Sequence, residues 1–326
     1  MRSVLPALAV LSLAVAALPA AAQSAAKYPD RPVRVIVAQT PGSSIDTMTR
    51  IVATKMSELL GQQLVVDNRT GAGGTIGAGI VASSDPNGYT LLAGATASQV
   101  IGPQLYKKTT NYEPLKDFTP VSLFAVTENV LCVNPKTPFK SVKDLIAYAK
   151  ANPGKVNWAN AGSGFQSHLA GVLFTHMAGI NVLHVPYKGA GASVGAVISG
   201  ESHLTLGPAP AMMPHVAGGR LRAVAMGGEK RSSLWPDLPT VIESGLPGYV
   251  SNGWAGIIVR TGTSKGIRDT LHSAVHKSIA DATVQSALKK VGADPVTSTP
   301  AEFSKVIAAD WKRFGDAIRA ADLKAN

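Results

Sequence analysis

Short runs of apolar residues alternate along this chain with longer stretches in which apolar residues recur every three or four positions. The first such run is Val33–Val37, and the helical pattern behind it continues to Gly61. Runs of β-branched residues are typical of buried strands, whereas a three-to-four spacing indicates a helix with one buried face. Because the alternation repeats along the chain, we expect parallel α/β sheets covered by helices.

The same pattern predicts the order of the remaining elements. Two further strands, at 64–67 and 90–93, follow the opening strand and helix, and a turn over 71–79 with a short helix separates them. Serine or threonine followed three residues later by an acid or amide marks a helix start, and such pairs occur at Ser141/Asp144 and Thr299/Glu302. Later strands are predicted at 156–159 and 182–185, and later helices at 143–150, 166–177, 193–198, 267–280, 284–291 and from 300 onwards.

Two apolar segments, at 120–133 and 254–259, are long enough to pass from one lobe to another. We therefore predict a discontinuous first lobe, made of 27–125 plus 249–326, and a second lobe made of 126–248. This layout places a ligand cleft between the lobes.

Residues 1–22 have the pattern of a secretory signal peptide. A short basic start and an apolar core precede the small residues Ala20, Ala21 and Ala22, which fit an A-x-A cleavage site. The core is too short and too rich in alanine for a good membrane span, which needs about 20 strongly apolar residues. We expect cleavage after Ala22 and a soluble periplasmic protein, with enough chain left for two domains of about 100–200 residues each.

Charge and cysteine content narrow the function classes. The formal net charge is +11, but the basic residues are spread along the chain and aromatic residues make up only 6%. An exported chain without a basic run or interleaved aromatics is not expected to bind nucleic acid. The single cysteine, Cys132, lies in an apolar run, which predicts a buried and unreactive thiol.

Three loops that lead from a predicted strand into a predicted helix are candidate anion sites. They cover 40–46, 160–166 and 187–193, and Ser43/Asp46 and Ser163/Gln166 fit capping boxes in the first two. The first N–H groups of a helix lack intrahelical acceptors and carry a partial positive charge. Parallel α/β sheets bind ligands beyond the carboxyl ends of their strands, so the three loops together favour a carboxylate site.

The candidate ligand-binding residues lie in these loops. The serine hydroxyls could donate to a carboxylate, and Asp46 would cap its helix and brace its loop, or recognise an amine or hydroxyl of the ligand. Tyr187 could stack on the ligand, Lys188 could pair with it, and Phe165 could form an apolar wall. As alternatives, Lys188 is a solvated surface charge and Phe165 is part of the core. The complete set is Thr40, Gly42, Ser43, Ser44, Asp46, Ala161, Gly162, Ser163, Phe165, Tyr187, Lys188 and Gly189.

Several motifs resemble those of Bug-type solute receptors of tripartite tricarboxylate transporters. They are Tyr-Pro-Asp-Arg-Pro-Val-Arg-Val-Ile-Val at 28–37, Pro-Gly-x-x-x-Asp at 41–46, Asp-Asn-Arg-Thr-Gly-Ala-Gly-Gly-Thr-Ile-Gly-Ala at 67–78, Val-Pro-Tyr-Lys-Gly at 185–189 and Pro-Thr-Val-Ile-Glu-Ser-Gly-Leu-Pro-Gly-Tyr at 239–249. The resemblance implies a two-lobed periplasmic binding protein of type II. It also implies a monomeric receptor that captures a small organic carboxylate, needs no cofactor and delivers its ligand to membrane permease subunits.

Two other functions remain open from the sequence. An exported hydrolase could use Ser163 with His168 or His184, although Ser163 lacks the G-x-S-x-G context of an esterase nucleophile. A ligand-sensing partner of a signalling receptor would use the same two lobes. His272 and His276 have a zinc-compatible spacing on a helix, but no glutamate motif accompanies them, so we expect no metal site.

Overall fold

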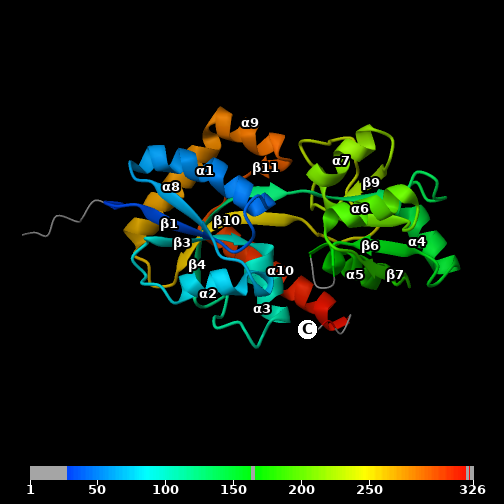
Figure 1. Cartoon of the computed structure of the whole chain (residues 1–326), viewed down its shortest axis with the longest axis horizontal. Coiled ribbons are helices and arrows are strands. Elements are labelled where there is room, and N and C mark those ends of the chain that lie inside the picture. Colours follow the sequence, from blue (N-terminus) through cyan, green and yellow to red (C-terminus); the bar gives the residue numbers. More distant parts are fainter. Residues whose placement is uncertain (1–27, 163–165, 321–322, 324–326) are drawn as a thin grey trace, which may run out of the picture.

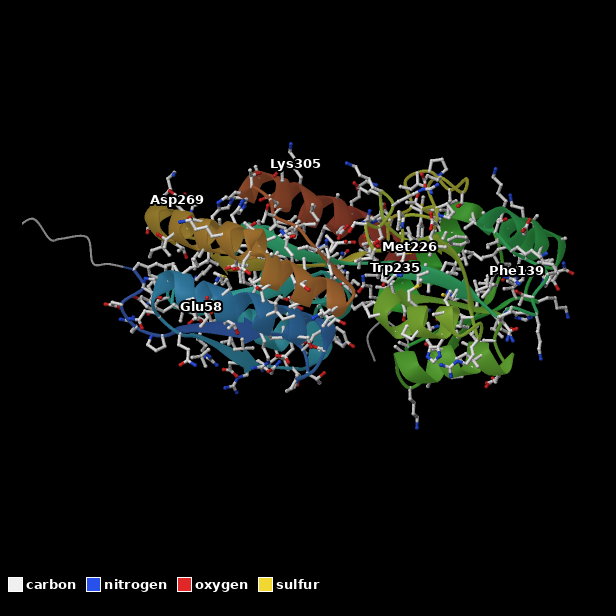
Figure 2. The ribbon with its side chains drawn as sticks, turned by 90° about the horizontal axis from the view of Figure 1, so that it is seen from above. Glu58, Phe139, Met226, Trp235, Asp269 and Lys305 are labelled. Atoms are coloured by element: carbon white, nitrogen blue, oxygen red, sulfur yellow. The ribbon has the colours of Figure 1, made fainter. Side chains whose placement is uncertain are left out.

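The protein has two lobes, each built around its own mixed β-sheet (Figure 1). The computed structural model describes residues 28–162, 166–320 and 323. The first sheet has six strands in the order β11-β4-β10-β3-β1-β2, and the second has five in the order β7-β6-β8-β5-β9. Seen at right angles to Figure 1, the lobes lie side by side along the long axis (Figure 2).

The first sheet begins with three parallel strands, because β1 pairs in parallel with both β2 and β3. The later strand β10 joins β3 and β4 in antiparallel pairing, and β11 extends the edge beyond β4. The strands are β1 (Val33–Val37), β2 (Leu64–Asn68), β3 (Thr90–Ala95), β4 (Phe118–Thr127), β10 (Gly253–Arg260) and β11 (Ala293–Pro295).

Two helical layers cover this sheet. The helices α1 (Ser44–Leu60), α8 (Lys265–Ala280) and α9 (Ala282–Lys290) lie on one face, over a core that includes Met56 and Leu271 (Figure 1). The other face is covered by η1 (Ala72–Gly74), α2 (Thr75–Ala82), the π-helix η2 (Ala97–Ile101), α3 (Gly102–Leu105) and α10 (Pro300–Ala320).

In the second sheet, β7, β6 and β8 are parallel, and β5 runs antiparallel to both of its neighbours, β8 and β9. The strands are β5 (Asn129–Val133), β6 (Asn157–Asn160), β7 (Leu183–Pro186), β8 (Leu204–Pro208) and β9 (Arg222–Met226). The helices are α4 (Val142–Ala151), α5 (Gln166–Ala178), α6 (Ala190–Ser199) and α7 (Ala209–Ala217).

The chain passes between the sheets twice. It leaves β4 at Thr127 and enters β5 at Asn129, so Glu128 alone separates the two strands. It returns between β9 and β10, through residues 227–252. The helix α10 starts on the first sheet and continues to α5, so that Ala317 joins the core of the second lobe while Leu169 of α5 packs into that of the first.

Most predicted elements are confirmed, and capping explains several of their ends. Ser43 and Ser141 accept hydrogen bonds from the backbone N–H three residues ahead, and Thr299 does so at α10. Gly61 ends α1 with a left-handed backbone (φ 70°), which glycine adopts without strain. Cys132 is buried, as expected.

Four expectations were wrong. The sheets are mixed, because the strands next to each chain passage pair antiparallel. Residues 254–259 do not cross but lie wholly in β10. The turn predicted over 71–79 stops at Gly74, and α6 begins at Ala190 rather than at Ser193. In α2, a side chain at Gly77 would come within 2.6 Å of the Arg69 carbonyl oxygen, so this glycine serves close packing and not a turn.

Candidate functional site

The loop between β1 and α1 is held by the Asp46 side chain. Its carboxylate accepts hydrogen bonds from the Gly42 backbone N–H at 2.8 Å and from the Asn68 side chain at 3.0 Å, and it pairs with the Arg50 guanidinium. Asn68 also donates to the Gln39 carbonyl, which ties the loop to the end of β2. Asp46 is 3% exposed and is therefore engaged within the protein, in the bracing position expected from the sequence.

Burial alone would raise the pKa of Asp46. Hydrogen bonds from Arg50, Gly42 and Asn68 outweigh this effect and lower the pKa below its usual value. The carboxylate is thus ionised, and Arg50 balances its charge. A ligand anion beyond the loop therefore meets a neutral pair instead of a bare carboxylate.

The other hydrogen-bonding groups of this loop lie at its surface, where a ligand could contact them. Thr40, Gly42 and Ser44 are exposed, and Ser43 is half-buried. The Ser43 hydroxyl accepts from the Asp46 N–H at 3.4 Å, a long hydrogen bond that leaves the hydroxyl proton free for another acceptor. The first turn of α1 therefore presents hydroxyl and N–H donors together.

The loop after β6 has two N–H groups that are already used. The Ala161 N–H donates to the Ser167 hydroxyl, and the Gly162 N–H donates to the Asn160 side chain, both at 3.0 Å. Gly162 has a φ of 136°, a conformation that side chains disfavour. Ser163 and Phe165 lie outside the described residues.

The third junction lies against the second. The Gly189 N–H donates to the Ala161 carbonyl at 3.0 Å, so these two loops of the second lobe form one surface. Gly189 precedes α6 without a side-chain cap, and Lys188 is exposed. The Tyr187 hydroxyl instead bonds to Glu201 at 2.8 Å and Ser202 at 3.2 Å, so it is used inside this lobe.

Loops from both lobes meet the passages between the sheets. In the first turns of α1, the Met48 sulfur accepts from the Thr127 hydroxyl at the end of β4. At the start of α5, the Gln166 side chain donates to the Ser251 carbonyl and lies against Gly253, where β10 begins. The start of α1 therefore contacts the outgoing passage and the start of α5 the returning one, and hydrogen bonds from Asn129 to Ser251 and Asn252 join the two passages.

The connecting segments themselves contain a buried carboxyl group that the sequence analysis did not select. Glu128 is 5% exposed, and its Oε2 has no hydrogen-bond partner. Burial raises its pKa to about 7; Asn252 opposes this shift, and the nearby charge of Asp294 adds to it. The sequence does mark this buried carboxyl group, because Glu128 is the one glutamate inside the apolar segment 120–133.

A second polar group missed by the sequence analysis follows β3. Gln99 is fully buried, and neither its amide oxygen nor its nitrogen has a partner; the Thr96 hydroxyl nearby is also buried and unpaired. Both follow the strand that pairs with β1, and Gln99 lies in a π-helical turn, a distortion frequent at functional sites. Their side chains offer donors and acceptors that the protein leaves unused.

The histidines form no metal-binding cluster in the described part of the chain, and the alternative that pairs His168 or His184 with Ser163 involves a residue outside it. The rings of His168 and His184 pack edge-to-face with centroids 5.5 Å apart. Burial lowers the pKa of both, and to about 4 for His184, so both are neutral near pH 7. His272 and His276 stack 4.1 Å apart, and across the described residues no three metal-ligating side chains come together.

Comparison with known proteins identifies the family. The model of the tripartite tricarboxylate transporter family receptor matches residues 48–323. The chain belongs to this receptor family. The resemblance to Bug-type receptors is confirmed by Protein BugT of Bordetella pertussis, which is 35% identical over 318 residues that cover 97% of this chain and 98% of BugT.

Solved structures of the family share the two-lobed fold. A periplasmic transporter is 37% identical with a TM-score of 0.75, over 91% of this chain and 99% of that chain. The protein Rpa4515 of R. palustris, solved with adipate, is 32% identical with a TM-score of 0.74, again over 91% of this chain and 99% of its own. None of the helices in the described part of the receptor has the length and apolar character of a bilayer crossing.

Proposed function

We propose that this receptor binds a small organic carboxylate between its lobes and delivers it to a membrane permease without chemical turnover. The supporting observation is that a strand–loop–helix junction from each lobe adjoins one of two neighbouring chain passages, through Met48 at Thr127 and Gln166 at Ser251. The carboxylate would lie at the amino ends of α1 and α5. The adipate bound to Rpa4515 supports an aliphatic acid as the class to test first.

In this proposal the ligand is held by neutral and partially positive donors. They are the hydroxyls of Thr40, Ser43, Ser44 and Ser163 with the first N–H groups of α1. Ala161, Gly162 and Phe165 would form the wall of the site in the second lobe. Gly189 and Lys188 would border the site, and Asp46 and Tyr187 would support its walls. Lobe closure would exclude water and strengthen the charge-assisted hydrogen bonds.

The proposed lobes are 27–125 plus 249–326, and 126–248. The same binding event could serve a signalling receptor in place of a permease, and a pulldown from membranes with and without ligand separates the two outcomes. We also propose that residues 1–22 are removed in the periplasm, that the mature chain is monomeric and that it binds neither cofactor nor nucleic acid. Sequencing of the mature amino terminus should then begin at Gln23.

A thermal-shift screen tests the binding proposal directly. The panel should contain mono-, di- and tricarboxylates, aromatic acids and acidic amino acids, applied to protein dialysed against EDTA. A ligand at about 100 times its dissociation constant adds about 2.7 kcal/mol of stability by mass action, which gives a clear shift. A panel without any shift, or one that needs added metal, would argue against the proposal.

Two matched serine variants locate the site. Ser43→Ala and Ser141→Ala each remove the cap of a helix, at a cost of about 1 kcal/mol in stability. Only Ser43→Ala should weaken binding of the best acid in the panel, by about 1.5–3 kcal/mol, because it removes a hydrogen bond to a charged group. Equal affinities of the two variants by calorimetry would place the site elsewhere. Ester hydrolysis lost in Ser163→Ala would instead establish an enzyme.

A further inference from the structure

The second sheet ends at the edge strand β9, which starts beside a groove in the surface. Its edge strand β9 pairs only with β5, and the segment after β9 covers this edge from Met226 onward, through hydrogen bonds to Pro239 and Val241. Beside the start of β9 lies a cavity of about 540 Å³. This volume falls in the range of about 300–1,000 Å³ that is usual for small-molecule sites.

The walls of the groove are largely apolar. Met213 and Val216 come from α7, and Leu234 and Trp235 come from the segment between β9 and β10. All four side chains are partly exposed, and Trp235 is labelled in the second lobe in Figure 2. An indole and three aliphatic side chains around one hollow favour an apolar chain or ring as the occupant.

One cationic group in this wall has no partner. The Arg222 side chain lines the groove, is half-buried and makes no hydrogen bond or ion pair in the described part of the chain; its Nη1 is buried. A buried donor of a charged group is costly unless an acceptor satisfies it. By contrast, Arg313, whose Nε is also buried and unpaired, forms an ion pair with Asp310 through Nη2. The groove therefore offers an unused site for an anionic oxygen.

The groove also contains one carboxylate. Asp237 is exposed at the groove and forms no ion pair among the described residues. A ligand with a second carboxylate would meet either this like charge or the apolar wall, and both are unfavourable. The charges thus select a monoanion over the di- and tricarboxylates of the family.

The groove is separate from the proposed cleft. Arg222 pairs with Val133, which also pairs with Leu204 at the start of β8. The chain passages at Glu128 and Gly227 lie at the other end of these strands, where Asn129 pairs with Pro208 and its carbonyl accepts from the Gly227 N–H. Arg222 and the junctions of the proposed cleft are therefore separated by the full length of these strands.

We propose that this groove is a second binding site, specific for an amphiphilic monocarboxylate. Its carboxylate bonds to the Arg222 guanidinium, and its apolar part packs against Trp235 and the aliphatic side chains. The site does not depend on the proposed cleft, and the two can be tested independently.

Calorimetric titration of the full mature chain with octanoate tests the proposal. We expect one site per chain, and Arg222→Gln should weaken binding about tenfold or more because a charge-assisted hydrogen bond is lost. Arg222→Lys should retain part of the affinity, and Asp237→Asn should increase it. Arg220→Gln removes the same charge two residues away, from an exposed side chain outside the groove, and should leave the affinity unchanged.

Three results would overturn the proposal. They are the absence of octanoate binding, equal effects of Arg222→Gln and Arg220→Gln, and loss of octanoate binding in Ser43→Ala. The last result would mean that octanoate occupies the cleft. Circular dichroism of each variant checks that the fold is retained.

Discussion

Single side chains in this receptor show how burial changes their chemistry. Glu128 is nearly inaccessible between two strands of different sheets, while Asp46, also buried, has three hydrogen-bonding partners. Burial disfavours the charged form of both carboxyl groups, but only Asp46 has enough donors to stay ionised at low pH. The two carboxyl groups therefore differ in protonation near neutral pH.

Glu128 should make stability depend on pH. Its pKa is about 7 in the folded protein, against an ordinary value of 4.5, so the folded state binds more protons between these values. This preference for the protonated form contributes fully to the free energy of unfolding below about pH 4.5, and the contribution is lost as the pH rises through 7. At about 1.4 kcal/mol per pKa unit, the loss is roughly 3 kcal/mol.

Denaturant unfolding between pH 5.5 and 8 measures this effect. The wild-type protein should lose stability relative to Glu128→Gln as the pH rises, because glutamine stays neutral. Glu229→Gln makes the same chemical change at an exposed residue nearby and should run parallel to the wild type. A constant difference between wild type and Glu128→Gln would show that Glu128 does not titrate in this range.

At the scale of elements, glycines within helices have different roles that their sequence context does not reveal. A side chain at Gly77 in α2 would approach the Ala38 Cα to 2.9 Å, so the helix packs there backbone to backbone. At the exposed Gly195 in α6, nothing lies within 4 Å of the added carbon.

Alanine substitutions at these two glycines should therefore have opposite signs. Gly195→Ala should stabilise the protein by about 0.4–1 kcal/mol, because alanine loses less conformational entropy in a helix. Gly77→Ala should destabilise it by about 1–3 kcal/mol through overpacking. Unfolding midpoints in urea measure both, and a stabilising Gly77→Ala would show that α2 can move away from β1.

At the scale of the whole molecule, the two lobes are joined by few segments. Further contacts join Asp294 of the first sheet to the hydroxyls of Ser232 and Ser233 in the returning segment, and α10 packs on α5. A receptor with two chain passages can close by rotation about them, the hinge motion seen in periplasmic binding proteins.

Ligand binding should therefore make the receptor more compact. We expect the radius of gyration from small-angle X-ray scattering to fall when the best acid of the panel is added, and to do so equally after EDTA treatment. Ser43→Ala at the same ligand concentration should show a smaller fraction of the closed form. An unchanged radius at saturation would mean that binding occurs without closure.

The amino-acid sequence by itself determined the local elements and the family. The β-branched run of β1, the caps at Ser43, Ser141 and Thr299, and Gly61 at the end of α1 act over a few residues, so their structure can be predicted from the pattern. The motifs from 28 to 249 identified the receptor family because their order and spacing are specific.

Only the tertiary structure decided how these elements use their polar groups. In the folded protein the Tyr187 hydroxyl bonds to Glu201, the N–H groups of Ala161 and Gly162 already have acceptors, and Oε2 of Glu128 and Nη1 of Arg222 have no hydrogen-bond partner. The tertiary structure also set the mixed strand directions, which follow from where the chain re-enters each sheet. These outcomes depend on residues far apart in the chain, and hydrophobic periodicity reports only which face of an element is buried, not which group lies opposite.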